Sequence, residues 1–148
     1  MYGFRVVGAE SGLQIRKARI GAGEIIAEHD PVTIKTDGEV YVADAGDVID
    51  GVALEAAIDG GDIHYKGGNR LLVLADNDND GTTFAVTHEG SRCDMIGTTG
   101  AVLVDTSSVA QVGNGADTGQ LLCRKFNPQG YGFDDDTSIG LYEVRERL

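Results

Sequence analysis

Short apolar runs, separated by glycine, aspartate and asparagine, recur along the whole chain, and this pattern constrains the fold more than any other feature. The runs have the length of strands rather than of helices, and several alternate apolar with polar residues. The chain holds 22 glycines but only 2 prolines, which suits a succession of tight turns. The sequence therefore predicts an all-β fold, a small β-barrel or β-sandwich of short antiparallel strands.

The predicted strands are residues 4–7, 13–20, 24–27, 32–35, 39–43, 48–54, 71–75, 83–87, 93–96, 101–104, 120–126 and 141–144. A further strand is indicated around His64, which alternates with apolar neighbours in GDIHYKGG. The stretch GDVIDGVALEAAIDGG also has apolar residues at helical spacing, although Gly51 in its middle disfavours a helix. We therefore expect at most one short helix.

The hairpin in VTIKTDGEVYV can be predicted residue by residue. Its apolar residues reach one face only if the loop holds an odd number of residues, because a shift by one residue moves every side chain to the other face. A three-residue loop, Thr36-Asp37-Gly38, with Gly38 in the left-handed region meets this condition. The predicted cross-strand pairs are Ile34 with Val40, Val32 with Val42 and Lys35 with Glu39.

The run Asp76-Asn77-Asp78-Asn79-Asp80-Gly81 is similar to the start of a calcium loop. An EF-hand needs flanking helices and a glutamate at the twelfth position, which is Thr87 here, so this class of site is excluded. We expect instead a hairpin of residues 71–75 and 83–87 with the acidic run at its tip. A calcium site between strands, formed by Asp76, Asp78 and Asp80, remains an alternative.

The expected organisation is a single β domain, residues 13–148, preceded by residues 1–12. Residues 1–12 combine Phe4, Val6 and Val7 with glycines, as a strand added to a neighbour's sheet edge would. A soft division is expected near residues 88–92, because the chain beyond it has longer polar stretches.

The charge balance, 24 acidic against 12 basic residues, gives a net charge of −12. Nucleic-acid binding needs a clustered basic surface, so we expect no nucleic-acid partner. The densest basic stretch, residues 16–19, is predicted to be the solvated side of a strand. No apolar run has the length of a membrane span or of a secretory signal, so we expect no membrane partner.

We find no pattern of a catalytic, cofactor or metal site in the sequence, and we expect the protein not to be an enzyme. The three histidines stand apart from any nucleophile motif, and the glycine-rich stretches are not followed by a phosphate-binding lysine. Cys93 and Cys123 are expected to be buried structural thiols. The run 134–136 is predicted to be a solvated turn, with a metal site at a subunit contact as its alternative.

The run GEIIAEHDPVTIKTDGEVYVADAGDVIDGVALEAAIDGGDIHYK resembles the capsid decoration, or cement, proteins of tailed bacteriophages. The resemblance covers about a third of the chain. The stretch MIGTTGAVLVDTSS also resembles phage structural proteins in its many small polar residues. The matching positions are Gly23, Asp30-Pro31-Val32, Asp37-Gly38, Gly51-Val52-Ala53, Ala56-Ala57 and Gly60-Gly61-Asp62-Ile63.

This resemblance implies a virion structural protein that binds the outer surface of an icosahedral phage head and stabilises contacts between major capsid subunits. It implies an extended N-terminal arm, here residues 1–12, that orders on binding. It also implies the major capsid protein as partner, self-association as a homotrimer, synthesis in the host bacterial cytoplasm and no cofactor. A calcium-dependent adhesion or carbohydrate-binding β module is the alternative function.

Overall fold

The computed structural model describes residues 1–110 and 119–145, and in this part of the chain nearly all regular structure is β-strand. The predicted all-β class is confirmed. A 3-10 turn, η1 (Val86–His88), is the one helical element among the described residues, and none of them forms a helix that is long and apolar enough to cross a membrane.

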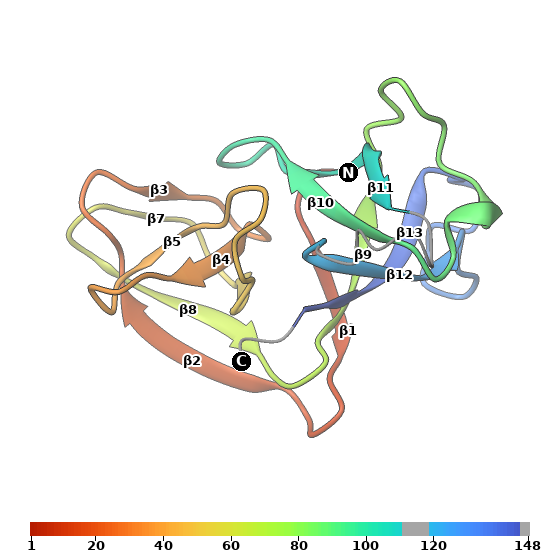
Figure 1. Ribbon diagram of the computed structural model, residues 1–148. Helices are drawn as coiled ribbons and strands as arrows, with labels where there is room; N and C mark the ends of the chain where they lie inside the picture. Colours follow the sequence, from red (N-terminus) through yellow and green to blue (C-terminus); the bar gives the residue numbers. More distant parts are fainter. Residues whose placement is uncertain (111–118, 146–148) are drawn as a thin grey trace.

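The first part of the chain forms a five-stranded antiparallel sheet and a separate two-stranded ribbon (Figure 1). At the end of β2, Ile20 forms a parallel bridge to Val40 of β5, so the two outer strands of the sheet meet there and the sheet curls. The sheet order is β2 (Gln14–Arg19), β8 (Asp62–Gly67), β6 (Gly51–Ala53), β4 (Pro31–Ile34) and β5 (Val40–Val42), and the ribbon is β3 (Ile25–Ile26) with β7 (Ala57–Ile58).

The N-terminal strand and the rest of the chain form a six-stranded antiparallel sheet. Its far strand returns towards the beginning of the sheet, because Val104 forms a bridge to Asn77 and Gly3 N–H donates to Val102 O (2.9 Å). The sheet therefore rolls up. Its order is β1 (Arg5–Gly8), β9 (Leu72–Asp76), β13 (Ile139–Val144), β12 (Leu121–Phe126), β10 (Arg92–Ile96) and β11 (Leu103–Ala110).

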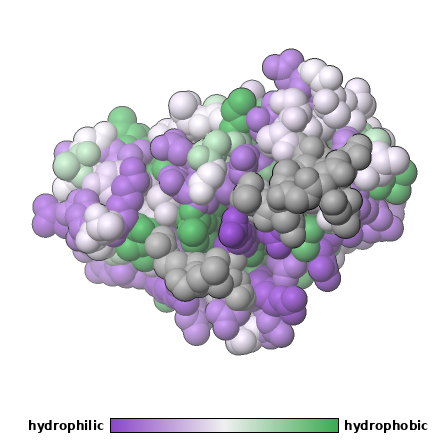
Figure 2. All heavy atoms as spheres, in the orientation of Figure 1, coloured by the Kyte–Doolittle hydropathy of each residue, from purple (hydrophilic) through white to green (hydrophobic). Residues whose placement is uncertain are grey.

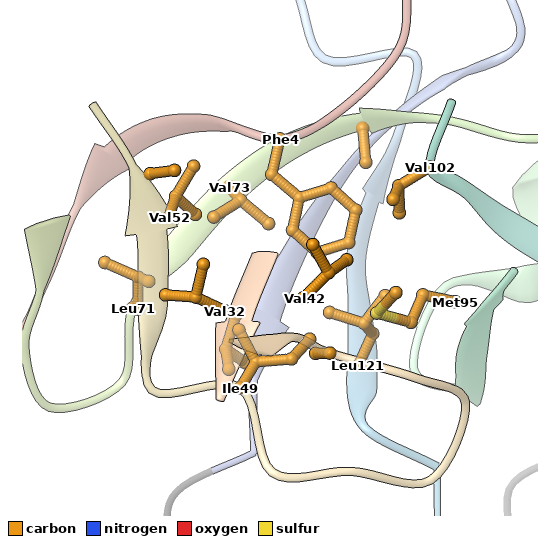
Figure 3. Close-up of a cluster of buried hydrophobic side chains, with 14 of the residues drawn as sticks. Phe4, Val32, Val42, Ile49, Val52, Leu71, Val73, Met95, Val102 and Leu121 are labelled. Atoms are coloured by element: carbon orange, nitrogen blue, oxygen red, sulfur yellow. The ribbon is translucent and has the colours of Figure 1, made fainter. Parts of the chain in front are cut away.

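The two sheets lie side by side and share one hydrophobic core (Figure 1). Figure 3 shows Phe4 at the centre of this core, between Val42 of the five-stranded sheet and Val73 and Val102 of the other half. Such burial of apolar surface is the main stabilising term for a β domain of this size.

The hairpin at residues 32–42 has the predicted register. Val32 pairs with Val42 and Ile34 with Val40. Gly38 has φ +80°, as the three-residue loop requires, and Gly38 N–H donates to Lys35 O (2.9 Å). Local turn chemistry and the alternation of apolar side chains are sufficient to fix this element.

The second predicted hairpin is wrong. β9 pairs with β1 on one edge and β13 on the other, so no edge is left for residues 83–87. That stretch contains η1 instead of a strand, and Val86 is 59% exposed rather than on the core face. Phe84 is buried as expected, but it packs against Phe126 (ring centroids 5.2 Å apart) of β12.

The other expected elements have varied outcomes. The stretch that also allowed a helix contains β6 and β7, and the strand indicated around His64 is β8. The expected N-terminal arm contains β1, which pairs with β9 of the same molecule, and Phe4 is fully buried. The chain passes between the two sheets at residues 9–13 and again at residues 68–71, whereas residues 88–92 lead directly into β10 of the six-stranded sheet.

We expect Gly51→Ala to lower the free energy of unfolding by about 1–3 kcal/mol. A Cβ at Gly51 would lie 2.4 Å from the backbone oxygen of Lys66, in the strand that pairs with β6, and a paired backbone cannot move aside cheaply. Urea denaturation would measure the loss. Gly8→Ala is the matched control, because a Cβ at Gly8 of β1 would meet nothing within 4 Å; equal losses in the two variants would contradict the expectation.

Candidate functional site

The three histidines are held by structural contacts at separate places. His29 lies in a turn with φ +73°, and its backbone oxygen accepts the Phe4 N–H (2.8 Å). His64 Nδ1 is 2.9 Å from Glu55 Oε1, and His88 Nδ1 accepts the Ala85 N–H (2.9 Å). The imidazoles of these residues thus contact carboxylate, backbone and aromatic groups, which is the arrangement of structural histidines.

Both cysteines are buried and unbridged, as the sequence predicted. Burial raises the pKa of the Cys123 thiol to about 12, and it raises the pKa of the Cys93 thiol further still. Both side chains are therefore protonated at neutral pH. A reactive or metal-binding cysteine needs the thiolate, so the two residues act as small apolar side chains of the core.

Two of the three carboxylates of the run 76–80, those of Asp76 and Asp78, have separate partners. Asp76 Oδ2 lies 3.2 Å from the α-amino group of Met1. Asp78 Oδ1 accepts the backbone N–H of Thr106 (3.1 Å) and that of Asp80 (3.2 Å). Asp78 thus holds this loop to β11, which is a structural role.

A calcium site needs several oxygens around one point. Within residues 1–110 and 119–145, no group of three or more His, Cys, Asp or Glu side chains lies close enough together to hold a metal ion. In the run 134–136, Asp134 Oδ1 accepts the Gly130 N–H (2.8 Å) and Asp136 Oδ1 accepts the Ser138 N–H (2.9 Å). These carboxylates stabilise their own loop.

We expect Asp78→Ala to lower the free energy of unfolding by about 1–2 kcal/mol and Asp78→Asn to lower it by much less, since the amide oxygen can still accept the Thr106 N–H. Both losses should be the same in calcium and in chelator. Thermal unfolding under the two conditions would measure this. A melting temperature of the unsubstituted chain that rises with calcium, with the rise absent in Asp78→Asn, would instead indicate a calcium site.

The surface offers features of another kind. On the face shown in Figure 2, hydrophilic residues dominate and hydrophobic ones form small, separate patches. Several large apolar side chains are nevertheless exposed. At one place they lie beside exposed cations on an outer strand, and at the other two of them face each other across a short ribbon. These are the strand β2 and the ribbon of β3 and β7.

β2 is an outer strand of the five-stranded sheet, and all of its side chains except the half-buried Ala18 are exposed. On its outer face Ile15 is 66% exposed and precedes two exposed cations, Lys17 and Arg19. The Lys17 Nζ and Asp62 Oδ2 atoms are 3.6 Å apart, and the Arg19 Nε and Glu39 Oε1 atoms are 3.9 Å apart. Exposed ion pairs of this kind contribute little, so both cations can exchange partners.

The ribbon face, formed by Ile25 and Ile58, is the second feature. The two residues lie directly opposite each other, and they are 59% and 68% exposed. Their neighbour Ile26 points to the other side and is buried. Thr99 Oγ1 donates to Ile25 O (2.6 Å), which fastens the ribbon to the loop before β11.

Sequence reasoning placed the cations of β2 on a solvated strand, which the structure confirms, but it missed that this strand is an edge. The signal was present, because cations concentrated on one strand are typical of protected sheet edges. It also missed the ribbon face, since two-residue strands leave no periodic pattern.

No family model matches the sequence, and no curated protein matches it significantly.

Proposed function

We propose that this chain is a non-enzymatic virion structural protein, a decoration protein that binds the outer surface of an icosahedral phage capsid. The partner would be the major capsid protein, with the chain self-associating as a homotrimer. The observation that carries the proposal is the ribbon face: two opposed, exposed isoleucines on a rigid β scaffold suit burial against another protein.

Two further observations support it. The stretch that resembles decoration proteins, residues 23–66, contains β3 to β7 and most of β8, and so includes the whole ribbon. The net charge of −12 would keep decorated particles soluble and mutually repelling. Clamping of this kind stabilises a shell by raising the cost of subunit separation, and symmetry multiplies each contact.

Co-sedimentation tests the proposal. Purified chain is added to undecorated capsids of the phage that encodes it, and we expect saturable, stoichiometric binding together with greater resistance of the shell to heat. Failure to bind, or binding without a gain in heat resistance, would contradict the proposal. The mass of the free protein in solution tests the trimer separately.

Substitution of the ribbon face sharpens this test. We expect the double substitution of Ile25 and Ile58 by serine to weaken capsid binding without unfolding the chain, because both side chains are already mostly in water. Val86→Ser is the matched control, since Val86 is 59% exposed but lies on η1 of the other sheet's half. If the double variant bound capsids as tightly as the control, the ribbon face would not be part of the interface.

A further inference from the structure

The backbone of β2 has one edge turned away from its sheet. Ile20 N–H donates to Gly61 O (3.0 Å) at the end of the β2–β8 pair, and hydrogen-bonded pairs alternate along antiparallel strands. The register pairs Ala18 with Ile63 and Arg16 with Tyr65. The amide and carbonyl groups of Ile15 and Lys17, which lie between these pairs, therefore point away from β8.

The contacts of β8 agree with this assignment. His64 is the residue opposite Lys17. Its N–H donates to Glu55 Oε1 (3.1 Å), and its backbone oxygen accepts the Leu54 N–H (3.0 Å). The backbone N–H and C=O of His64 therefore point away from β2. In the described part of the chain no strand pairs with the outer edge of β2 before the bridge at Ile20; we call residues 14–18 with these outward groups the β2 edge.

An unpaired edge is a template for an added strand, and the cations on this edge protect it against strands that carry no complementary charge. A second copy of the chain fits poorly, because pairing of two β2 strands would bring Arg16, Lys17 and Arg19 of each copy close together, and like charges across a strand pair repel. Extended segments without charge gain nothing from these cations. The edge therefore selects a strand that carries carboxylates.

The positions of the side chains define the partner further. Ile15, Lys17 and Arg19 alternate on one face, opposite Lys66, His64 and Asp62 of β8. The bridge of Ile20 to Val40 places Glu39, the residue before β5, beside Arg19, so an added strand has to end before Arg19. An antiparallel added strand would place an acidic side chain opposite Lys17 and an apolar one opposite Ile15, because directly opposed residues share a face. Read in its own direction, that segment has an acidic residue and, two positions later, an apolar one.

We propose that the β2 edge receives such an extended acidic segment of another protein chain by strand addition. That this segment belongs to the major capsid protein rests on the proposed function. The added strand would gain two kinds of contact: backbone hydrogen bonds to Ile15 and Lys17, and a charge-assisted contact to Lys17.

A synthetic capped peptide serves as the probe, with Glu at its second position, to face Lys17, and Ile at its fourth, to face Ile15. We expect it to bind, to lose affinity with rising salt, and to protect the amides of Ile15 and Lys17 from hydrogen exchange. The same peptide with Lys in place of the Glu should bind at least about tenfold more weakly. Absence of binding by the acidic peptide, or binding that protects no β2 amide, would overturn the proposal.

Two substitutions of Lys17 separate charge from backbone pairing. Lys17→Ala removes the cation, and we expect affinity to fall about two- to fivefold. Lys17→Pro removes the cation and also the outward N–H. Proline is tolerated on an edge strand where its missing N–H would face away from the sheet, and we expect at least a further tenfold loss of affinity. Lys125→Ala, which removes an exposed cation of β12, is the control that should change nothing. Equal losses in Lys17→Ala and Lys17→Pro would overturn strand addition.

Capsid binding distinguishes this inference from the function on which its partner rests. If Lys17→Pro binds capsids as tightly as the wild-type chain does, the inference is overturned and the decoration function stands. Absence of wild-type binding to capsids would overturn the decoration function, while peptide binding with protected β2 amides would still support strand addition. If Lys17→Pro does not fold, the exchange measurement and Lys17→Ala still decide the outcome.

Discussion

Replacing Phe4 by alanine is expected to lower the free energy of unfolding by about 3–5 kcal/mol, the largest effect of any single substitution that we predict here. Phe4 is fully buried where the two sheets share their core, and its N–H donates to His29 O (2.8 Å) (Figure 3). The substitution would leave a ring-sized cavity between strands whose backbones are fixed by their own pairing. Urea denaturation followed by circular dichroism would measure the loss.

Tyr2→Ala is the matched control for this prediction. It removes an aromatic ring two residues away, but the Tyr2 side chain is 57% exposed. We expect a loss below about 1 kcal/mol, which is usual for surface positions. If the two variants lost stability equally, or if Phe4→Ala were harmless, residues 1–8 would not form part of the folded core in solution.

Asn77→Ala is expected to lower the free energy of unfolding by about 2–4 kcal/mol, because it leaves buried polar groups without partners. Asn77 Nδ2 donates to Tyr142 Oη (2.6 Å) and to Ser138 O (2.9 Å). Its Oδ1 accepts the Thr106 hydroxyl (3.2 Å). Tyr142 and Thr106 are fully buried, and water cannot replace these contacts without opening the structure.

The same denaturation experiment checks this prediction, with Asn69→Ala as its control, since Asn69 is an exposed residue near the start of β9. We expect the control to lose less than about 0.5 kcal/mol. A loss below about 1 kcal/mol in Asn77→Ala would show that the network between β9, β11 and β13 does not stabilise the fold. In that case Asp78 would have to hold the loop alone.

The two hairpin predictions show where reading the sequence succeeds and where it fails. The hairpin at residues 32–42 was predicted with its register, because its partners are neighbours in the sequence and its loop requires one glycine at φ +80°. Residues 71–87 carry an equally good alternation, yet β9 pairs with β1 and β13. Competition from distant strands decided this element, and local pattern does not contain that information.

The candidate surfaces show the same limit. The cations of β2 were recognised as solvated from the sequence, because a charged strand face does not bury itself. Whether that strand lies at the edge or in the middle of a sheet depends on which strands pair with it. Among the strands of the described residues, β8 alone pairs with Gln14–Arg19 along its length. The acidic run 76–80 likewise could not be assigned until its carboxylates were seen to hold Thr106 and Met1.

By itself, the sequence determined the all-β class, the register of one hairpin, and the burial of Cys93 and Cys123. These features follow from side-chain period and turn chemistry, which act over a few residues. Only the tertiary structure decided which strands are neighbours, and with that the shared core around Phe4, the exposed edge of β2 and the ribbon face. Strand order is a contest between partners far apart in the chain, and it is settled by the total apolar surface that each arrangement buries.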